Sequence, residues 1–131
     1  MSKKKILFVC IENSNRSQMA EAFTRMQNSD GIEVWSAGSR PSGKVNPRAV
    51  QFMKEKGYDL TTHRSKSLTD VPEEAYDYVI TMGCGEECPF IPAKHRQDWA
   101  LTDPKTLDDD GFRGIRDEIE QRVKRLLDNI Q

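Results

Sequence analysis

Blocks of apolar and polar residues alternate along the chain, and their periods predict strands and helices in turn. Apolar runs at residues 6–9, 32–37 and 78–82 indicate buried strands, and a short fourth strand is expected at 97–100. Between and after these runs, apolar residues recur at helical spacing. The predicted first and last helices contain Met19, Ala22, Phe23 and Met26, and Ile115, Ile119, Val123, Leu126, Leu127 and Ile130.

This alternation predicts an α/β fold: one domain, residues 1–131, with a four-stranded parallel sheet and helices on both faces. Pro47 suits the first turn of a middle helix, and Gly57 suits its end. Ligands of such sheets bind at the carboxyl ends of the strands. Because Cys10, Cys84 and the loop after Trp99 follow predicted strand ends, we expect one crevice to gather them.

The segment between the first strand and the first helix can hold an anion against a thiol. Cys10 ends the strand, Arg16 follows six residues later, and Ser17 suits the helix N-cap. Free N–H groups and the positive end of the helix dipole favour an anion there, and with Arg16 they stabilise a thiolate. The alternative is a buried cysteine followed by a solvated arginine. The preceding strand and the following helix favour the anion loop.

The charge composition limits the classes of binding partner that the chain is expected to have. Lys and Arg total 20 and Asp and Glu 21 in 131 residues, so the net charge supports neither a nucleic-acid nor an anionic-membrane partner. The apolar run at 6–11 is too short for a signal-peptide core or a membrane span. We therefore expect a cytoplasmic protein whose three cysteines are working thiols.

Cys84 and Cys88 flank a polar segment that contains Gly85. A metal pair is disfavoured because His63 and His95 form no ligand-spaced motif, which leaves a redox pair or two packing residues. Residues four apart on a helix hold their Cβ atoms about 5–6 Å apart, whereas a disulfide needs roughly 3.5–4.5 Å. A Cys84–Cys88 disulfide would therefore change the shape of the segment, which glycine permits.

Asp103 precedes Pro104, which keeps it out of the helical region. Beside a bound anion it could donate a proton to a leaving oxygen, and otherwise it is an ordinary turn residue.

Taken together, these motifs resemble the thioredoxin-coupled arsenate reductases, which share the fold of the low-molecular-weight protein tyrosine phosphatases. Both groups have Cys-x5-Arg-Ser and a distal Asp-Pro. The reductases are favoured by the segment 18–21 after Ser17, by Lys105 where the phosphatases usually have tyrosine, and by the pair Cys84 and Cys88; the segment 36–38 also matches.

The resemblance implies a mechanism. Cys10 attacks arsenate, Asp103 protonates the departing oxygen, and Cys84 then attacks the Cys10–arsenic adduct, which releases arsenite. Cys88 next attacks the Cys10–Cys84 disulfide, and a thioredoxin-type dithiol reduces Cys84–Cys88. The implied anion-binding residues are Ile11, Glu12, Asn13, Ser14, Asn15, Arg16 and Ser17. Among them, the resemblance implies that Asn13 organises the loop and that the Ser17 hydroxyl supports the thiolate.

The external reductant is expected to be thioredoxin or a low-molecular-weight thiol system, and the protein is expected to be a monomer. No bound cofactor is expected, with a monovalent cation as the one candidate. Many relatives have glycine at Glu12 and a cysteine at Asn15, so Glu12 places an unusual carboxylate near the anion site. Some relatives bind potassium through residues matching Asn13, Glu21 and Ser36, with aspartate where this chain has Lys66. A lysine ammonium there could replace the ion.

Two alternatives remain open. One is a phosphatase of the same fold, acting on phosphotyrosine or a small phosphomonoester, an activity that could also accompany the reductase as a weak side reaction. The other is a non-enzymatic thiol sensor that uses Cys84 and Cys88 as its switch.

Overall fold

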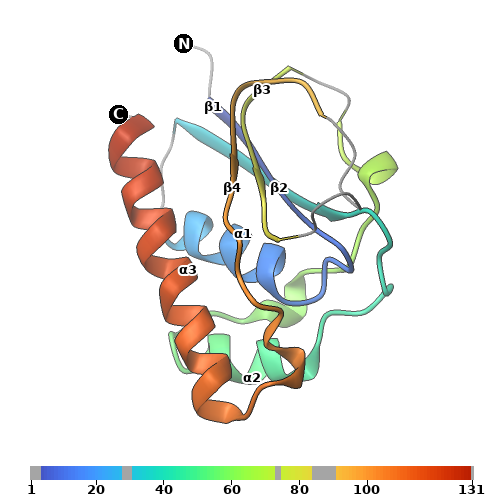
Figure 1. Ribbon diagram of the computed structural model, residues 1–131, viewed down its shortest axis with the longest axis vertical. Coiled ribbons are helices and arrows are strands. Elements are labelled where there is room, and N and C mark those ends of the chain that lie inside the picture. Colours follow the sequence, from blue (N-terminus) through green and yellow to red (C-terminus); the bar gives the residue numbers. More distant parts are fainter. Residues whose placement is uncertain (1–3, 28–30, 73–74, 84–90, 131) are drawn as a thin grey trace.

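The computed structural model describes residues 4–27, 31–72, 75–83 and 91–130 (Figure 1). Cys84 and Cys88 lie outside the described residues. The strands are β1 (Lys4–Cys10), β2 (Ile32–Gly38), β3 (Tyr76–Thr81) and β4 (Ala93–Asp98). The helices are α1 (Arg16–Met26), α2 (Pro47–Lys54) and α3 (Asp109–Ile130), with short 3-10 helices η1 (Leu60–Thr62), η2 (Leu68–Asp70) and η4 (Pro104–Thr106).

The four strands form one parallel sheet in the order β2-β1-β3-β4, which confirms the predicted sheet. β1 is central, and five consecutive residues from Ile6 to Cys10 are buried because the strand is covered on both faces. The chain leaves β1 toward β2 on one side and reaches β3 on the other. The carboxyl end of β1 is therefore the switch point where ligands of open α/β sheets bind.

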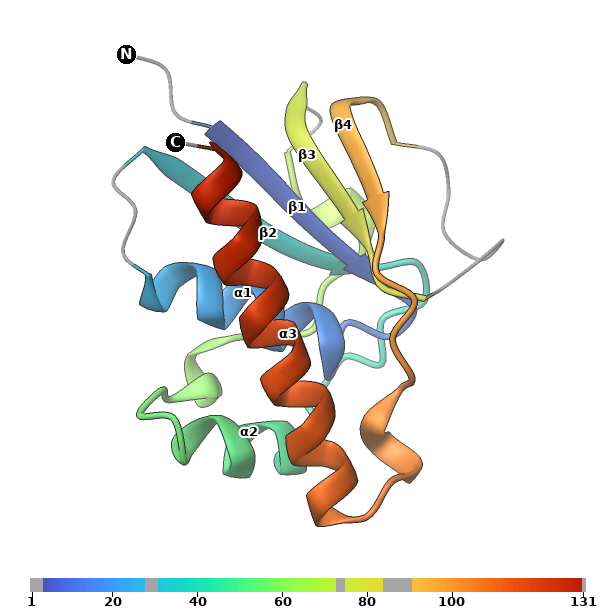
Figure 2. The same ribbon diagram turned by 60° about the vertical axis from the view of Figure 1, so that its left-hand side comes forward.

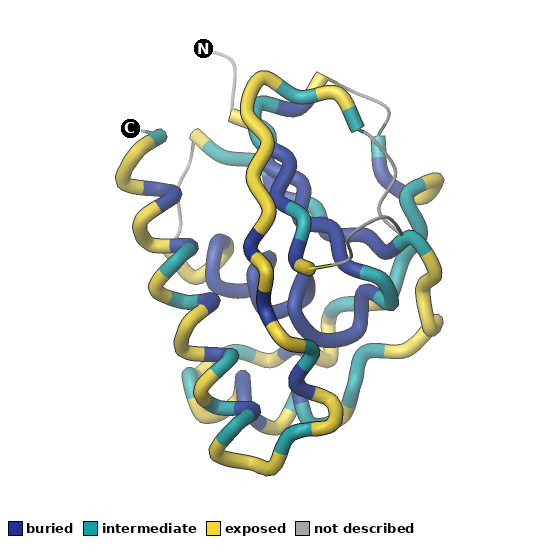
Figure 3. The backbone as a smooth tube through the Cα atoms, viewed as in Figure 1, coloured by how far each residue is buried: buried dark blue, intermediate teal, exposed yellow. Residues whose placement is uncertain are grey.

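The three α-helices lie on one face of the sheet, and the segment with the 3-10 helix η2 covers the other. The long helix α3 and helix α1 pack on one face, with α2 beside them (Figure 2). The core on this face contains Phe8, Met19, Phe23, Phe52, Phe112 and Ile119. The other face buries Leu7, Val9 and Val79 under the segment that contains η2. Figure 3 shows the resulting pattern, with β1 and α1 buried and the outer side of α3 exposed.

Several boundaries differ from those predicted. The fourth strand occupies Ala93–Asp98 rather than 97–100, because it is an edge strand whose polar side chains give no apolar signal. α3 begins at Asp109, before the first apolar residue of its predicted stripe. Pro47 does open α2, with Asn46 as its N-cap. In the described part of the chain, no helix is long and apolar enough to cross a membrane.

Candidate anion-binding and thiol site

The predicted site is a loop that joins β1 to α1. Cys10 is the last residue of β1 and Arg16 the first of α1. The loop's carbonyl groups accept hydrogen bonds of 2.8–3.2 Å from the segment after β2: Ser39 to Cys10, Arg40 to Ile11, Ser42 to Glu12 and Asn46 to Ser14. In a trans peptide the next N–H points opposite to the carbonyl. The loop therefore turns its N–H groups inward, as an anion cradle requires.

The Cys10 sulfur lies at the base of this cradle. The residue is 2% exposed, and Asn13 donates its backbone N–H to Sγ at 3.2 Å. Ser17 Oγ lies 2.9 Å from Sγ and accepts a hydrogen bond from Asn13 Nδ2 at 2.7 Å. Because the Ser17 oxygen already accepts from Asn13, its own proton is available to the sulfur. Both donors suit a sulfur that carries negative charge.

Ser17 is not the N-cap residue that its spacing predicted. The N-cap of α1 is Asn15, without a side-chain cap bond, and Ser17 lies inside the first turn. Its hydroxyl points to Cys10 instead of capping the helix. The resemblance implies that this hydroxyl supports the thiolate, and its oxygen lies 2.9 Å from the sulfur.

Two residues hold the shape of the loop. Asn13 has a φ of 51°, and its side-chain oxygen accepts hydrogen bonds from Gln18 Nε2 and from the Lys66 backbone, both at 2.8 Å. At the end of β2, a Cβ on Gly38 would lie 2.5 Å from the carbonyl oxygen of Ile11. Only glycine allows the loop this close, which gives the matched segment 36–38 a physical reason.

Arg16 is buried rather than solvated, which excludes the alternative weighed for this motif. It is 5% exposed, and its Nη1 donates to the carbonyls of Met82 at 2.6 Å and Leu101 at 2.8 Å. Gly83 has a φ of 86°, and a Cβ there would lie 3.0 Å from Nη1. The guanidinium thus joins the ends of β1, β3 and β4, and its Nη2 faces Asp103.

Asp103 lies beside the loop, as the crevice argument predicted. Its Oδ2 is 3.9 Å from Arg16 Nη2 and 4.0 Å from Lys105 Nζ, and its Oδ1 accepts from Asn15 Nδ2 at 3.4 Å. It also caps η4 by accepting the Lys105 N–H at 3.1 Å, so the carboxylate is oriented from two sides. Its side chain is 31% exposed, enough to meet a ligand in the cradle.

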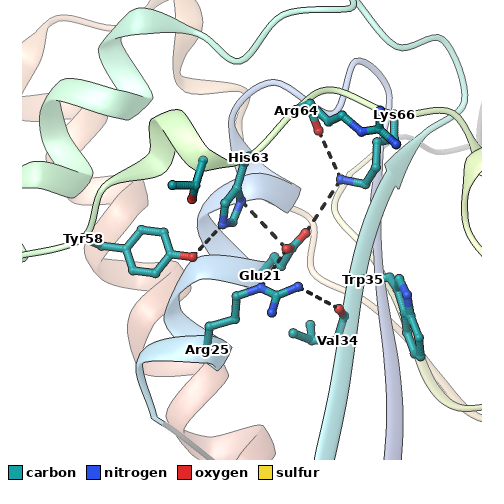
Figure 4. Close-up of a pocket in the computed structure, with 9 residues that line it drawn as sticks. Glu21, Arg25, Val34, Trp35, Tyr58, His63, Arg64 and Lys66 are labelled. Atoms are coloured by element: carbon teal, nitrogen blue, oxygen red, sulfur yellow. Dashed lines mark hydrogen bonds and ion pairs between the residues drawn. The ribbon is translucent and has the colours of Figure 1, made fainter.

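A second polar cavity of about 390 Å³ opens beside the loop, between α1, β2 and the segment after η1 (Figure 4). Its centre is Glu21, 5% exposed, which accepts Ser36 Oγ at 2.6 Å and Arg25 Nε at 2.9 Å. Lys66 Nζ lies 3.9 Å from the same carboxylate and donates to the Arg64 carbonyl. Burial lowers the pKa of Lys66, while Glu21 raises it.

His63 links this cavity to the loop, a connection that sequence reasoning missed. Its Nδ1 lies 2.9 Å from Gln18 Oε1, an acceptor, so Nδ1 carries the proton, and Nε2 accepts from Tyr58 at 2.6 Å. Gln18 in turn donates to the Asn13 carbonyl at 3.0 Å. Burial lowers the pKa of His63, against the opposing effect of Glu21. No spacing signal joins His63 to Gln18, because they are 45 residues apart.

A monovalent cation does not fit this cavity as it stands. The Lys66 ammonium lies beside Glu21, and the side-chain oxygen of Asn13 is already engaged by two N–H donors. In the described ranges, no group of three or more His, Cys, Asp or Glu residues could hold a metal ion.

A thiol at the end of a central strand, an inward-facing N–H loop and a clamped arginine define a class of enzymes that bind tetrahedral oxyanions through a cysteine. The chain belongs to the low molecular weight phosphotyrosine protein phosphatase family, whose sequence model matches residues 5–131.

Similar proteins within this family share most of the chain. Arsenate reductase 2 of Staphylococcus saprophyticus is 38% identical and covers 98% of this chain and 100% of its own. The glutaredoxin arsenate reductase of Synechocystis is 36% identical, over 97% of this chain and 98% of its own. The solved thioredoxin-dependent arsenate reductase of Corynebacterium glutamicum superposes with a TM-score of 0.83 at 37% identity, over 99% of this chain and 63% of that one.

Proposed function

We propose that this protein is an arsenate reductase that uses Cys10 as its nucleophile and an external dithiol as its reductant. The observation that carries the proposal is the Cys10 sulfur, which lies within an N–H cradle and receives hydrogen bonds from Asn13 and Ser17. Arg16 and Asp103 stand together at the same loop. The named relatives supply the reaction: proteins with the same fold and 36–38% identity are arsenate reductases.

The chemistry follows from these positions. The Cys10 thiolate attacks the arsenic atom of arsenate, an As–S bond forms, and one oxygen leaves as water after Asp103 gives it a proton. The inward N–H groups and Arg16 hold the remaining oxygens. Arsenic is still pentavalent at this stage, and its reduction by two electrons needs a second thiol, which is oxidised together with Cys10 to a disulfide.

The second stage uses the cysteines outside the described residues. The Cys84 thiolate attacks the sulfur of Cys10, and the As–S electron pair stays on arsenic. Arsenite is released, and the protein retains a Cys10–Cys84 disulfide. Cys88 attacks Cys84 and frees the Cys10 thiolate. A dithiol protein then reduces Cys84–Cys88 and becomes the disulfide itself.

We propose that the reductant is of the thioredoxin type. We also propose that the protein acts as a monomer in the cytoplasm. The similar proteins include both a thioredoxin-dependent and a glutaredoxin arsenate reductase, so both dithiols belong in the assay. A reducing compartment supports the relay because Cys10, Cys84 and Cys88 must all return to thiols in each cycle.

For the cation, we propose that the Lys66 ammonium takes the place of a monovalent ion beside Glu21. The contacts that support this are the 3.9 Å approach of Nζ to Glu21 and the donation of Nζ to the Arg64 carbonyl. The positive charge that stabilises the buried carboxylate then comes from the chain itself.

The second candidate is hydrolysis of a phosphate ester, which the family and the oxyanion loop favour. The decisive experiment measures reductant-coupled turnover with arsenate beside hydrolysis of an aryl phosphate. We expect continuous oxidation of thioredoxin with arsenate, at a kcat/KM far above that for the ester. A thiol sensor would instead stop after one oxidation. Cys10→Ser should abolish both activities while the fold is retained, because a serine hydroxyl is a far weaker nucleophile than a stabilised thiolate.

A further inference from the structure

Four side chains of alternating charge form a row at the mouth of the anion loop. Glu12 Oε2 lies 3.0 Å from Lys105 Nζ, Lys105 Nζ lies 4.0 Å from Asp103 Oδ2, and Asp103 Oδ2 lies 3.9 Å from Arg16 Nη2. The Arg16 side chain is 6% exposed and that of Asp103 31%, whereas those of Lys105 and Glu12 at the outer end are 48% and 35% exposed. The row therefore leads from the buried guanidinium out to solvent.

The Glu12–Lys105 contact connects the two sides of the mouth. Glu12 belongs to the loop itself, whereas Lys105 belongs to η4, 93 residues further along the chain. The hydrogen bond to Glu12 is the largest cause that raises the pKa of Lys105, and its attraction to Asp103 adds to this. Lys105 is therefore a fixed positive charge between two carboxylates.

We propose that the Glu12–Lys105 pair is a specificity device, which admits an inorganic tetrahedral oxyanion and disfavours an aryl ester. The inference rests on the proposed function and names what sets its substrate class. Two physical effects carry it, one of charge and one of space.

The charge effect concerns the incoming oxyanion. An unpaired Glu12 carboxylate in the loop would repel a dianion, and Lys105 cancels that charge. As a pair on the surface the two residues add little to stability, since exposed ion pairs contribute about 0–1 kcal/mol. The pair matters more for the binding of a ligand with two negative charges, because without Lys105 the uncancelled charge of Glu12 would act on that ligand.

The space effect concerns the leaving group. The oxygen that departs must face Asp103, its proton donor, and the ammonium of Lys105, which is paired with Glu12, lies 4.0 Å from the Asp103 carboxylate. With arsenate this oxygen carries at most a proton and needs no further room. With an aryl ester it carries a ring, which would have to displace a salt bridge with an apolar surface.

The test is a double-mutant cycle of wild type, Lys105→Met, Glu12→Gln and the double variant. We expect Lys105→Met to raise the KM for arsenate by roughly 10-fold, because one uncancelled charge now acts on a dianion at close range. The double variant should return to within about 3-fold of wild type, since no charge remains to cancel. For an aryl phosphate, kcat/KM should rise in the double variant by about 10-fold, as the mouth is no longer bridged.

Lys94→Met is the matched control. It removes one lysine whose side chain is 70% exposed and pairs with Asp77, at the far end of β4 from the site. We expect its KM for arsenate to equal that of wild type. If Lys105→Met and the double variant show the same KM for arsenate, or if the ester is hydrolysed no faster by the double variant, the inference is overturned.

Oxyanion binding is measured separately from turnover, by protection of Cys10 from alkylation with increasing arsenate or inorganic phosphate. The protection constants should follow the same pattern as KM, with weaker protection in Lys105→Met and recovery in the double variant. If wild type reduces no arsenate yet the protection constants show the cycle, the proposed reaction fails while the specificity device stands. If reduction proceeds and the constants are independent of both substitutions, the device fails while the proposed reaction stands.

Discussion

At the scale of single residues, Arg16 shows why the site tolerates little change. One nitrogen of its guanidinium bonds two backbone carbonyls, those of Met82 and Leu101, so the orientation of the group is set before any ligand arrives. Preorganisation of this kind is the main way in which an enzyme stabilises developing charge. Gly83 borders the same nitrogen, and its positive backbone φ disfavours other residues. A glycine at this position therefore leaves room for the guanidinium.

Asp103→Asn separates proton donation from positioning. The amide keeps an oxygen to accept the Lys105 N–H that caps η4, but it cannot give a proton to a leaving oxygen. We expect oxyanion protection of Cys10 to be retained and the first chemical step to slow by about 10²–10⁴-fold, the range of a positioned acid. Single-turnover kinetics under excess enzyme measure this step. An unchanged rate would reduce Asp103 to a cap of η4.

Residues with a local signal were predicted from the sequence, and residues that act through distant contacts were not. Cys10 and Arg16 stand out because a strand and a helix flank them, and Asp103 because a proline follows it. His63 was considered only as a metal ligand, since nothing in the sequence shows that it reaches Gln18. Ser17 was placed at the N-cap because its spacing fits, and only the family resemblance pointed to its contact with the Cys10 sulfur, because that contact depends on the folded loop.

At the scale of elements, the central strands were predictable because they are buried on both faces, whereas the fourth strand was expected but its bounds were wrong. Each side chain of β1 from Ile6 onward is buried, which produces an unbroken apolar run. Among the described strands, β4 pairs with β3 alone, and from Lys94 to Asp98 its residues are exposed. Its position is decided by pairing with β3, a non-local interaction that periodicity cannot report.

The meeting of α1, β2 and the segment after η1 at Glu21 leads to a prediction about Lys66. Lys66→Met should lower Tm, because the buried Glu21 carboxylate loses a nearby positive charge. Lys66→Asp should lower it further in sodium chloride, and potassium chloride at equal concentration should restore part of the loss, since binding to the native state alone raises Tm. For wild type, and likewise for Lys66→Met, Tm should not change when potassium chloride replaces sodium chloride. A potassium-specific rise in wild type would mean that an ion binds with Lys66 in place.

At the scale of the whole molecule, the strand order brings the parts of the proposed relay toward one edge. Cys10 ends β1, and Gly83 follows β3, its neighbour in the sheet. The N–H of Gly83 is bonded to Asp98 at 3.2 Å, and Arg16 lies against the same glycine. Cys84 is the next residue in the sequence. A relay between Cys10 and Cys84 therefore requires no connection across the molecule, only an approach along the carboxyl edge of two adjacent parallel strands.

The relay assigns Cys84 and Cys88 successive tasks, so their variants should fail at different steps. In Cys84→Ser, Cys10 has no resolving thiol, and arsenite release should require a small added thiol. In Cys88→Ser, one arsenite should be released per enzyme before the protein stops as the Cys10–Cys84 disulfide. Single-turnover arsenite release, with peptide mass spectrometry of the disulfides, measures both. If both variants behaved alike and turned over repeatedly with thioredoxin alone, both cysteines would be packing residues, and the electrons for arsenate would have to reach Cys10 directly from the external dithiol.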